Sequence, residues 1–283
     1  MIKLPKRKAD SNKGDYGHVF VIAGSAGFTG AAALCSWAAL VSGSGLVTLG
    51  IPKSLYPIMA RKLTEAMAMP LPETRGQALS EKAYPAIMKF SEKTDCVAIG
   101  PGLSGDQSTQ RLIRKLVIIL KKPVVLDADG INALEGKPEL LNRANAPVVI
   151  TPHPGEMSRL SGLSVKRIAA AKEKVAKEFA NKYNVVCVLK GHRTVVARPD
   201  GKTYVNSTGN PGMAKGGTGD VLTGMIASFI GQGMRPFNAA MLGVYLHGLA
   251  GDLAAKEKGE VSMLASDLLN KIPEAIKKLQ RSQ

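Results

Sequence analysis

The strongest constraint on the fold is a regular alternation of short apolar runs with helical segments. Runs rich in Val and Ile recur along the chain, each followed by turn residues, at 18–24, 45–52, 66–72, 95–102, 123–130, 147–155 and 185–191. Apolar and polar residues alternate little within these runs, which is typical of strands covered on both faces. Helical spacing of apolar residues marks segments between them, at 31–43, 107–120 and 164–183. This order predicts an α/β fold with a mostly parallel central sheet and helices on both faces.

The pattern changes in the last third of the chain. Residues 193–207, "RTVVARPDGKTYVNS", predict two short strands around a turn, which is typical of a small hairpin at the edge of a sheet. Three helical segments are predicted after it, at 219–231, 236–256 and 263–279. No internal repeat and no linker rich in Pro, Gly or Ser divides the sequence. We therefore expect residues 1–283 to form a single domain.

The turns that follow the predicted strands indicate where a ligand binds. In open parallel sheets, ligands bind outside the carboxyl ends of the strands. The turns at that edge are rich in small and polar residues: "GSAGFTG" at 24–30, "GPGLSG" at 100–105, "DADGIN" at 127–132, "TPHPGEM" at 151–157 and "KGHRT" at 190–194. We expect them to converge on one pocket.

A glycine-rich stretch, "GNPGMAKGGTGD" at 209–220, directly precedes the helix predicted at 219–231. Free N–H groups and the positive end of the helix dipole attract phosphate, and glycines let the backbone come close to it. The alternative is a glycine-rich turn that only caps the helix, for which Asp is also well suited. The additional glycines before residue 216 favour an anion site formed by the amides of residues 216–219.

Asp220 lies at the joint between this stretch and the helix. In phosphoryl transfer, the protein mostly positions groups and stabilises charge, while an acidic side chain orients or deprotonates the attacking hydroxyl. A position in the first turn of a helix favours the ionised carboxylate. Asp220 is therefore predicted to be a permanently ionised, weak base that aims a substrate hydroxyl at a bound phosphate.

Two common nucleotide motifs are absent. A P-loop requires GxxxxGK[ST], but Val196 occupies the first glycine position ahead of "GKT" at 201–203. The turn at 24–30 spaces its glycines as GxxGxxG, unlike the GxGxxG of a dinucleotide-binding unit. The phosphate chemistry is therefore predicted near residue 216.

A net charge of +16, from 38 Lys and Arg against 22 Asp and Glu, favours anionic ligands or a solvated basic face. Nucleic acid is not an expected partner, because aromatic residues are only 5% of the chain and do not interleave with the basic segments. Glycines divide the uncharged region 16–52, so no membrane span is expected. Three separated cysteines and the lack of an apolar signal segment favour a cytoplasmic protein.

Four blocks in this order carry a resemblance to a known family: "VVLDADGINAL" at 124–134, "VITPHPGE" at 149–156, "VLKGHRTVV" at 188–196 and "GNPGMAKGGTGDVLTG" at 209–224. The chain resembles the ADP/ATP-dependent NAD(P)H-hydrate dehydratases of the ribokinase-like superfamily, from about residue 14 to the final helix. The resemblance implies a lyase that repairs nicotinamide cofactors. ADP or ATP would phosphorylate the ring hydroxyl of the S form of hydrated NADH or NADPH, and loss of phosphate would restore the cofactor.

The same resemblance implies roles for individual residues. Asp220 matches the catalytic aspartate and also contacts the substrate. The other substrate-binding positions are Thr29, Ala31, Gly102 and His153. The nucleotide-binding positions are Lys190, Gly191, His192, Arg193 and Thr194 on the adenosine side, and Asn210, Pro211, Gly212, Met213, Ala214, Lys215, Gly216, Gly217, Thr218 and Gly219 around the phosphates. Mg²⁺ is expected as a cofactor, without assigned ligands. Lys215 departs from the small residue common in the family, so its charge could face a phosphate or solvent.

Other interpretations and properties stay open. A ribokinase-like kinase for a thiamine-precursor alcohol or a vitamin would share the glycine-rich helix start. A nucleotide-responsive protein with a basic face for nucleic acid is a non-enzymatic alternative. Homo-oligomerisation, up to a tetramer, is expected, and the helices predicted at 236–256 and 263–279 are apolar enough to offer a contact surface. No N-terminal epimerase domain is expected, because the chain starts at the dehydratase block.

Overall fold

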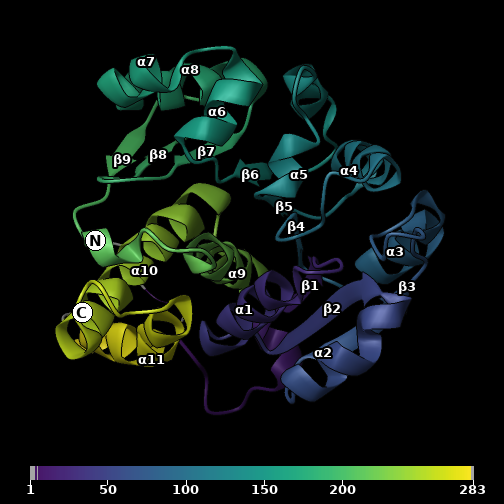
Figure 1. The fold of residues 1–283 in the computed structure, drawn as a ribbon. Helices are drawn as coiled ribbons and strands as arrows, with labels where there is room; N and C mark the ends of the chain where they lie inside the picture. Colours follow the sequence, from purple (N-terminus) through teal and green to yellow (C-terminus); the bar gives the residue numbers. More distant parts are fainter. Residues whose placement is uncertain (1–3, 5, 282–283) are drawn as a thin grey trace.

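A mixed sheet of nine strands forms the centre of the computed structural model (Figure 1), which describes residue 4 and residues 6–281. Residues 1–3, 5, 282 and 283, which the single-domain prediction also covers, lie outside the described residues. The spatial order is β3-β2-β1-β4-β5-β6-β7-β8-β9. The strands are β1 (His18–Ile22), β2 (Leu46–Pro52), β3 (Met67–Leu71), β4 (Cys96–Ile99), β5 (Val124–Leu126), β6 (Val148–Ile150), β7 (Val186–Leu189), β8 (Val195–Ala197) and β9 (Thr203–Val205).

Every predicted apolar run contains one of the first strands, β1 to β7, and these pair in parallel. The predicted hairpin is also confirmed, because β8 and β9 add to β7 in antiparallel pairing at one end of the sheet. The mostly parallel α/β architecture predicted from the sequence is therefore correct.

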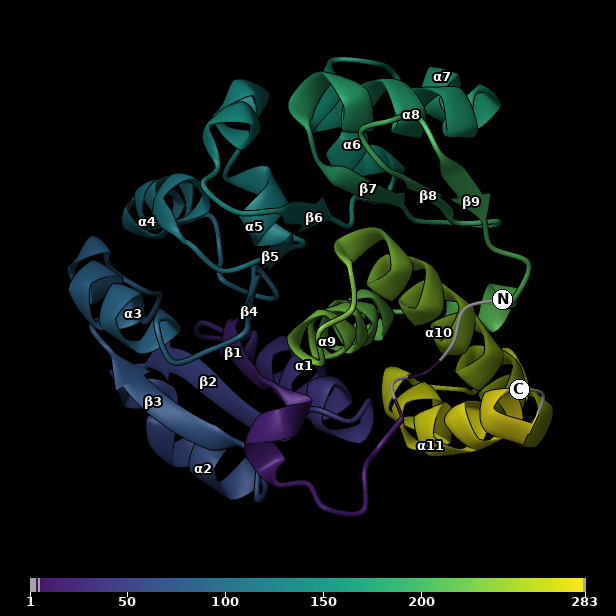
Figure 2. The same ribbon diagram turned by 180° about the vertical axis from the view of Figure 1, so that it is seen from behind.

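Helices cover both faces of the sheet (Figures 1 and 2). On one face lie α1 (Thr29–Val41), α2 (Tyr56–Lys62), α9 (Thr218–Gly231), α10 (Pro236–Lys258) and α11 (Ala265–Arg281). On the other lie α3 (Tyr84–Ser91), α4 (Gln107–Ile119), α5 (Asp129–Asn132), α6 (Pro154–Ser161), α7 (Val165–Ala170) and α8 (Lys172–Tyr183). Short 3₁₀ turns occur at Lys13–Tyr16, Lys53–Leu55, Glu81–Ala83, Pro138–Arg143 and Pro211–Met213.

Successive side chains of each central strand enter two different cores. Val19 and Val21 of β1 belong to the core under α1 and α9, whereas Phe20 and Ile22 belong to the core under α3 and α4. Both cores are apolar, so every position of β1 after His18 is buried. This double burial explains why the runs show no polar alternation in the sequence.

The helix predicted at 164–183 is divided in two, which corrects that prediction. Ala171 has φ −134° and ψ 41°, outside the helical region, and separates α7 from α8. The break brings the Lys172 ammonium within 2.9 Å of the carbonyl oxygen of His192, to which it donates a hydrogen bond. Alanine favours helix, so nothing in "IAAAKE" signals the break. The short helices α2, α3, α5 and α6 were not predicted either.

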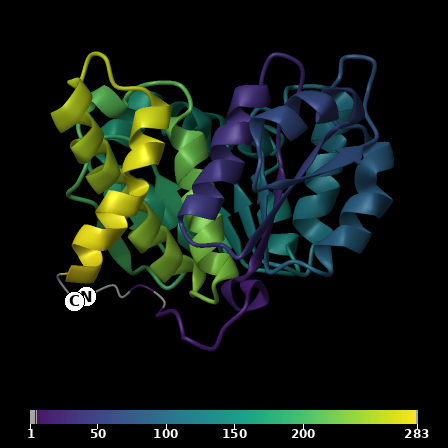
Figure 3. The same ribbon diagram turned by 90° about the horizontal axis from the view of Figure 1, so that it is seen from below.

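Helix α9 runs from the carboxyl edge of the sheet to the opposite edge. Its start lies beside Asp127 and Lys190, which follow β5 and β7, and its end, Gly231, lies against Gly17, which precedes β1. It packs between α1 and α10 and against β1, β4 and β5, while α11 covers α10 (Figure 3). The predicted glycine–aspartate joint is therefore placed at the edge where the turns converge. Within the described part of the chain, no helix is long and apolar enough to cross a membrane.

Candidate active site at the start of α9

The glycine-rich stretch leads into α9 as predicted. Gly217 is the N-cap residue, with φ 94°, and no side chain caps the helix. Gly216 has no other part of the protein within 4 Å of the position that a Cβ would occupy. The first turn of α9 therefore combines uncapped N–H groups with an open approach, which is the arrangement that binds anions.

Hydrogen bonds hold the preceding loop against α10. The Asp252 carboxylate accepts from the Gly209 N–H and from the Asn210 amide, both at 3.0 Å. The Asn210 side-chain oxygen accepts from the Gly212 N–H at 3.0 Å. Gly212 packs closely on Glu260, since a Cβ there would lie 2.7 Å from the backbone of Glu260. The glycines thus form a tightly packed loop of fixed shape, not a loose linker.

A cavity of about 900 Å³ opens beside this loop. It brings together most of the predicted nucleotide-binding residues, which come from two segments of the sequence: Lys190, Gly191, His192, Arg193, Thr194, Asn210, Pro211, Met213, Ala214, Lys215, Gly216, Thr218 and Gly219. His153, which the resemblance placed with the substrate, also lines this cavity.

The remaining predicted residues do not line this cavity. Gly212 packs against Glu260, Gly217 packs against Leu34, and Asp220 is half-buried in the first turn of α9. Ala31 and Gly102 lie together at a different place, since a Cβ on Gly102 would be 3.2 Å from the Ala31 Cβ. Thr29 begins α1 beside them and accepts a 3.3 Å hydrogen bond from Lys62. The structure thus separates the predicted nucleotide residues from this second group.

Sequence reasoning missed several residues of the cavity wall. Some precede or begin the glycine-rich stretch, and others come from α9 and α10: Asn206, Thr208, Gly209, Leu222, Val244, His247 and Gly248. The buried His247 donates from Nε2 to the Thr218 carbonyl oxygen at 2.8 Å. Burial lowers the pKa of His247 to about 4, so the ring is neutral at pH 7. The spacing of Val244, His247 and Gly248 on one helix face would indicate a shared surface, but not which surface.

Asp220 is not the permanently ionised group that the helix position predicted. Burial and then the neighbouring charge of Asp127 raise the pKa of Asp220 to about 7, although the Lys190 ammonium opposes this shift. Desolvation therefore outweighs the helix dipole, whose effect at a helix end is usually about 1 kcal/mol or less. A carboxyl group of this kind accepts a proton near neutral pH more readily than an ordinary aspartate does.

Lys190, which lines the cavity with residues 191–194, is held by two carboxylates. Its ammonium lies 2.6 Å from Asp127 Oδ1 and 3.9 Å from Glu156 Oε2, and its side chain is 18% exposed. Burial alone would lower the pKa of Lys190, but the charges of Asp127 and Glu156 raise it overall. Lys190 is therefore a fixed cation at the cavity wall, close to the start of α9.

The side chains of His153 and Lys215 both form hydrogen bonds with the backbone of the protein. His153 Nδ1 accepts from the N–H groups of Gly155 and Glu156 at 3.0 and 3.2 Å and so caps α6. Burial, followed by the charge of Lys190, lowers the pKa of His153. The Lys215 ammonium donates to the Val261 carbonyl oxygen at 2.6 Å, so this charge is directed toward the loop after α10.

Two adjacent glycines of the loop should differ sharply on substitution. Gly217→Ala places a side chain at φ 94° and 2.6 Å from Leu34 Cδ1, whereas Gly216→Ala meets no atom within 4 Å. We expect Gly217→Ala to reduce the free energy of unfolding by about 1–3 kcal/mol and Gly216→Ala to change it by less than about 0.5 kcal/mol. Thermal melting of the two variants checks this, and equal melting temperatures would contradict the described loop geometry.

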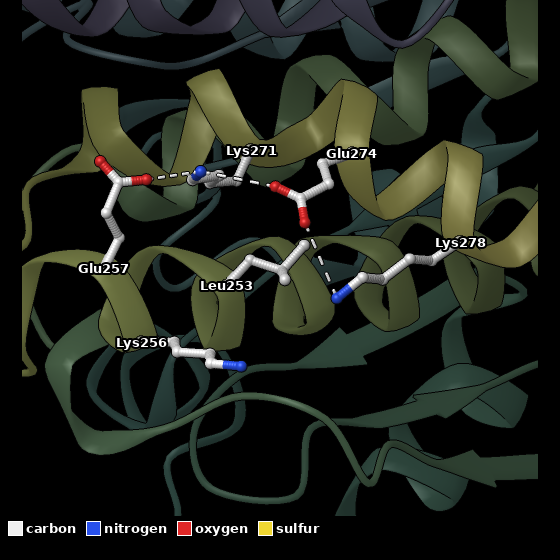
Figure 4. A pocket seen from close by; sticks show the side chains of 6 residues that line it. All are labelled: Leu253, Lys256, Glu257, Lys271, Glu274 and Lys278. Carbon is white, nitrogen blue, oxygen red and sulfur yellow. Dashed lines mark hydrogen bonds and ion pairs between the residues drawn. The ribbon is translucent and has the colours of Figure 1, made fainter.

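A second hollow, of about 340 Å³, lies between α10 and α11 (Figure 4). Most of its charged side chains pair with one another: Lys271 pairs with Glu257 at 2.5 Å and with Glu274 at 3.4 Å, and Glu274 also pairs with Lys278. Solvent-exposed ion pairs of this kind contribute little stability individually. We therefore assign no chemistry to this hollow.

Known structures show the broad fold class of this protein. A ribokinase-like superfamily protein of Enterococcus faecalis superimposes with a TM-score of 0.80 at 30% identity, over 96% of this chain and 91% of that one. The sheet, the glycine-rich loop and the aspartate at the start of α9 define the chain as a ribokinase-like α/β protein.

The sequence model of the NAD(P)H-hydrate dehydratase family matches residues 19–274, and the chain belongs to that family. An ADP/ATP-dependent NAD(P)H-hydrate dehydratase of Bacillus subtilis, crystallised with ATP and Mg²⁺, superimposes with a TM-score of 0.82 at 34% identity, over 97% of this chain and 94% of that one. The bifunctional NAD(P)H-hydrate repair enzyme of Moorella thermoacetica is 47% identical over 98% of this chain. The chain spans only 52% of that relative's length.

Proposed function

We propose that this protein is an ADP- or ATP-dependent dehydratase that converts the S form of hydrated NADH or NADPH back to the reduced cofactor. The family match over residues 19–274 is the observation that supports this most strongly. The position of Asp220, beside a glycine-bordered cavity at a helix start, agrees with the chemistry. The reaction belongs to the carbon–oxygen lyases, since a C–O bond is broken and a double bond forms.

The nucleotide would lie in the 900 Å³ cavity, whose volume suits a ligand of this size. The N–H groups of residues 216–219 and the helix dipole of α9 would hold its terminal phosphates. Residues 191–194 and 210–215 would line the rest of the nucleotide, and the Lys190 ammonium, next to Gly219, would face its phosphates. Arg193, at φ 53°, lies in a left-handed conformation within the 191–194 turn, which lines the cavity.

The hydrated nicotinamide would bind between His153, at the wall of this cavity, and the turns around Thr29, Ala31 and Gly102. Asp220, at the start of α9, would accept the proton of the ring hydroxyl while the hydroxyl oxygen attacks the terminal phosphorus. The bond from phosphorus to the departing ADP or AMP breaks. The ring carbon then loses phosphate, and the adjoining carbon loses a proton to give the double bond. Phosphorylation thus converts a poor leaving group into a good one.

Mg²⁺ is part of the proposal only as a companion of the nucleotide. Among the described residues, no group of three or more His, Cys, Asp or Glu side chains is arranged to hold a metal ion. Mg²⁺ commonly keeps several waters and binds to nucleotide phosphates through few protein ligands. An all-protein magnesium cage is therefore not proposed, and the charge of the phosphates would be neutralised jointly by the ion and the α9 amides.

We further propose that residues 1–283 form one ribokinase-like domain, that the protein works in the cytoplasm, and that it assembles as a homo-oligomer. The cytoplasmic location is supported by the buried, unpaired state of Cys35, Cys96 and Cys187. Assembly up to a tetramer is supported by exposed apolar side chains on α1 and α2, where Trp37 and Ile58 are each 45% exposed. Sedimentation velocity measures the assembly directly.

Recovery of the reduced cofactor tests the proposed function. The purified protein is incubated with hydrated NADH or NADPH, Mg²⁺ and either ADP or ATP. We expect the near-ultraviolet absorbance of the reduced nicotinamide to return only when a nucleotide is present, with release of stoichiometric phosphate. The rival kinase activity is tested with thiamine-precursor and vitamin alcohols in the same buffer. Phosphorylation of such an alcohol without cofactor recovery would overturn the proposal.

A further inference from the structure

The buried carboxylate of Asp127 has no role in the function proposed so far. It follows β5, and its residue is only 1% exposed. It accepts hydrogen bonds from the Lys190 ammonium at 2.6 Å and from the Thr223 hydroxyl at 2.7 Å. A buried charge is costly unless it is paired and hydrogen-bonded in this way. The carboxylate therefore links three elements, because Lys190 follows β7 and Thr223 belongs to α9.

The backbone of Asp127 is equally constrained. Its N–H donates to the Ile99 carbonyl at 3.0 Å, and its own carbonyl accepts from the Gly130 N–H at 2.8 Å. A Cβ on Gly100 would lie 1.8 Å from the Asp127 carbonyl oxygen, so the adjacent turn packs directly on it. Asp127 is thus a fixed point from which the positions of Lys190 and Thr223 are set.

Both partners of Asp127 lie next to Asp220. Thr223 is one turn after Asp220 on α9, and its hydroxyl also approaches the Gly219 carbonyl oxygen at 3.2 Å. A Cβ on Gly219 would be 3.3 Å from the Lys190 ammonium and 3.7 Å from Asp127 Oδ2. The ammonium therefore lies against the residue that directly precedes Asp220. Asp220 itself forms no ion pair with any residue that the structure describes.

We propose that Asp127 is a positioning residue for phosphoryl transfer: by binding Lys190 and Thr223, it fixes the ammonium at the cavity wall and prevents it from pairing with Asp220. The proposal rests on the proposed function. A lysine side chain is flexible and strongly charged, so without this restraint it would turn to the nearest free carboxylate. A base that is paired with an ammonium loses much of its basicity. Held on Asp127, the ammonium stays available to a phosphate in the cavity instead.

Several charged or titratable groups face Asp220 and act on it together. They come from the ends of β5 and β7 and from α1, α5 and α6: Asp127, Lys190, Cys35, Asp129 and Glu156. His247 of α10 is neutral, with Nε2 bound to the carbonyl oxygen of Thr218, two residues before Asp220. Asp127 and Glu156 both raise the pKa of Asp220 and both pair with the cation that lowers it. Asp127 has the larger effect on the pKa and the shorter contact with the ammonium, 2.6 Å against 3.9 Å.

The test uses Asp127→Asn in the full-length protein, with Asp129→Asn as the matched control. Asp129 also faces Asp220, but its carboxylate binds the Ser104 N–H and Asn132, not Lys190. In Asp127→Asn, the freed Lys190 ammonium and the loss of the Asp127 charge both lower the pKa of Asp220. We expect the acid limb of the kcat/KM profile to move to lower pH by about one unit or more. We also expect kcat to fall about 10–100-fold, while the KM for the nucleotide stays nearly unchanged. Asp129→Asn should retain kcat and move the limb by less than about half a pH unit.

Titration of the Asp220 carboxyl carbon by NMR makes the test independent of turnover. Its pKa should be lower in Asp127→Asn than in the wild type and higher in Lys190→Met, which removes the cation. If Asp127→Asn does not fold, the titration of Asp220 in Lys190→Met serves as the test, and an unchanged pKa there would contradict the proposal. An unmoved Asp220 titration in both variants would overturn the proposal, even if the rate fell. A wild-type protein that does not recover the cofactor, but shows both titration shifts, would overturn the proposed function and leave the positioning role intact.

Discussion

Replacement of Asp220 by Asn should reduce turnover of the hydrated cofactor by about 10²–10⁴-fold, which is the usual contribution of a positioned general base. The carboxamide keeps the shape of the side chain but cannot accept the proton of the ring hydroxyl. The cavity and the N–H groups of residues 216–219 are unaffected, so nucleotide affinity should stay within about threefold. Single-turnover kinetics and calorimetric nucleotide titration measure the two effects separately.

The rate should also depend on pH in a direction that follows from the pKa of Asp220. Asp220 acts as a base only when deprotonated, and burial together with the Asp127 charge raises its pKa to about 7. The kcat/KM of the wild type should therefore rise with pH through about 7, whereas the residual rate of Asp220→Asn should show no such limb. Asp10→Asn serves as the control, because it makes the same carboxylate-to-carboxamide substitution at an exposed position in the N-terminal segment. If Asp220→Asn retained more than about a tenth of the wild-type rate, Asp220 would not be the base.

Local chemistry made the strands and the α9 joint predictable. Residues such as Val19–Ile22 and Val148–Ile150 are apolar at every position, because helices cover both faces of the sheet. Burial on both faces of the sheet therefore produces continuous apolar runs that can be recognised in a single sequence. The Gly217–Asp220 joint was predictable for a related reason, since left-handed backbone and a helix start both have strong residue preferences.

The electrostatic character of the site was not predictable in this way. Asp127 bonds to Lys190 and Thr223, which are 63 and 96 residues away in sequence, so no local pattern relates them. The protonation of Asp220 was predicted wrongly because the helix position was visible in the sequence and the burial was not. His247 was missed for the same reason, since its contact with Thr218 depends on how α10 packs on α9. Long-range packing therefore decides the properties that matter most for catalysis.

Gly224→Val should destabilise the protein more than Gly217→Ala does, because it forces two helix backbones apart. Gly224 is in the middle of α9, and a Cβ there would lie 2.1 Å from the Cys35 carbonyl oxygen and 3.0 Å from the Ala39 backbone nitrogen of α1. Those atoms belong to a helix backbone, which cannot rotate away as a side chain can. We expect a loss of about 3 kcal/mol or more, and a melting temperature lower by roughly 5–10 °C.

The same substitution should also impair catalysis, because α9 carries both Asp220 and the amides proposed to bind phosphate. Relief of the contact requires α9 to move away from α1, and that displaces the first turn relative to Asp127 and Lys190, which are fixed by the sheet. Gly30→Ala in α1 is the matched control, since nothing lies within 4 Å of its Cβ position, and helix propensity predicts equal or slightly higher stability there. Thermal melting is measured on both variants, and cofactor recovery is compared between Gly224→Val and the wild type, because Gly30 lies between Thr29 and Ala31 of the proposed substrate site. If Gly224→Val melted like the wild type, the close packing of α1 on α9 would be wrong, and so would the inference that this packing holds Asp220 at the cavity.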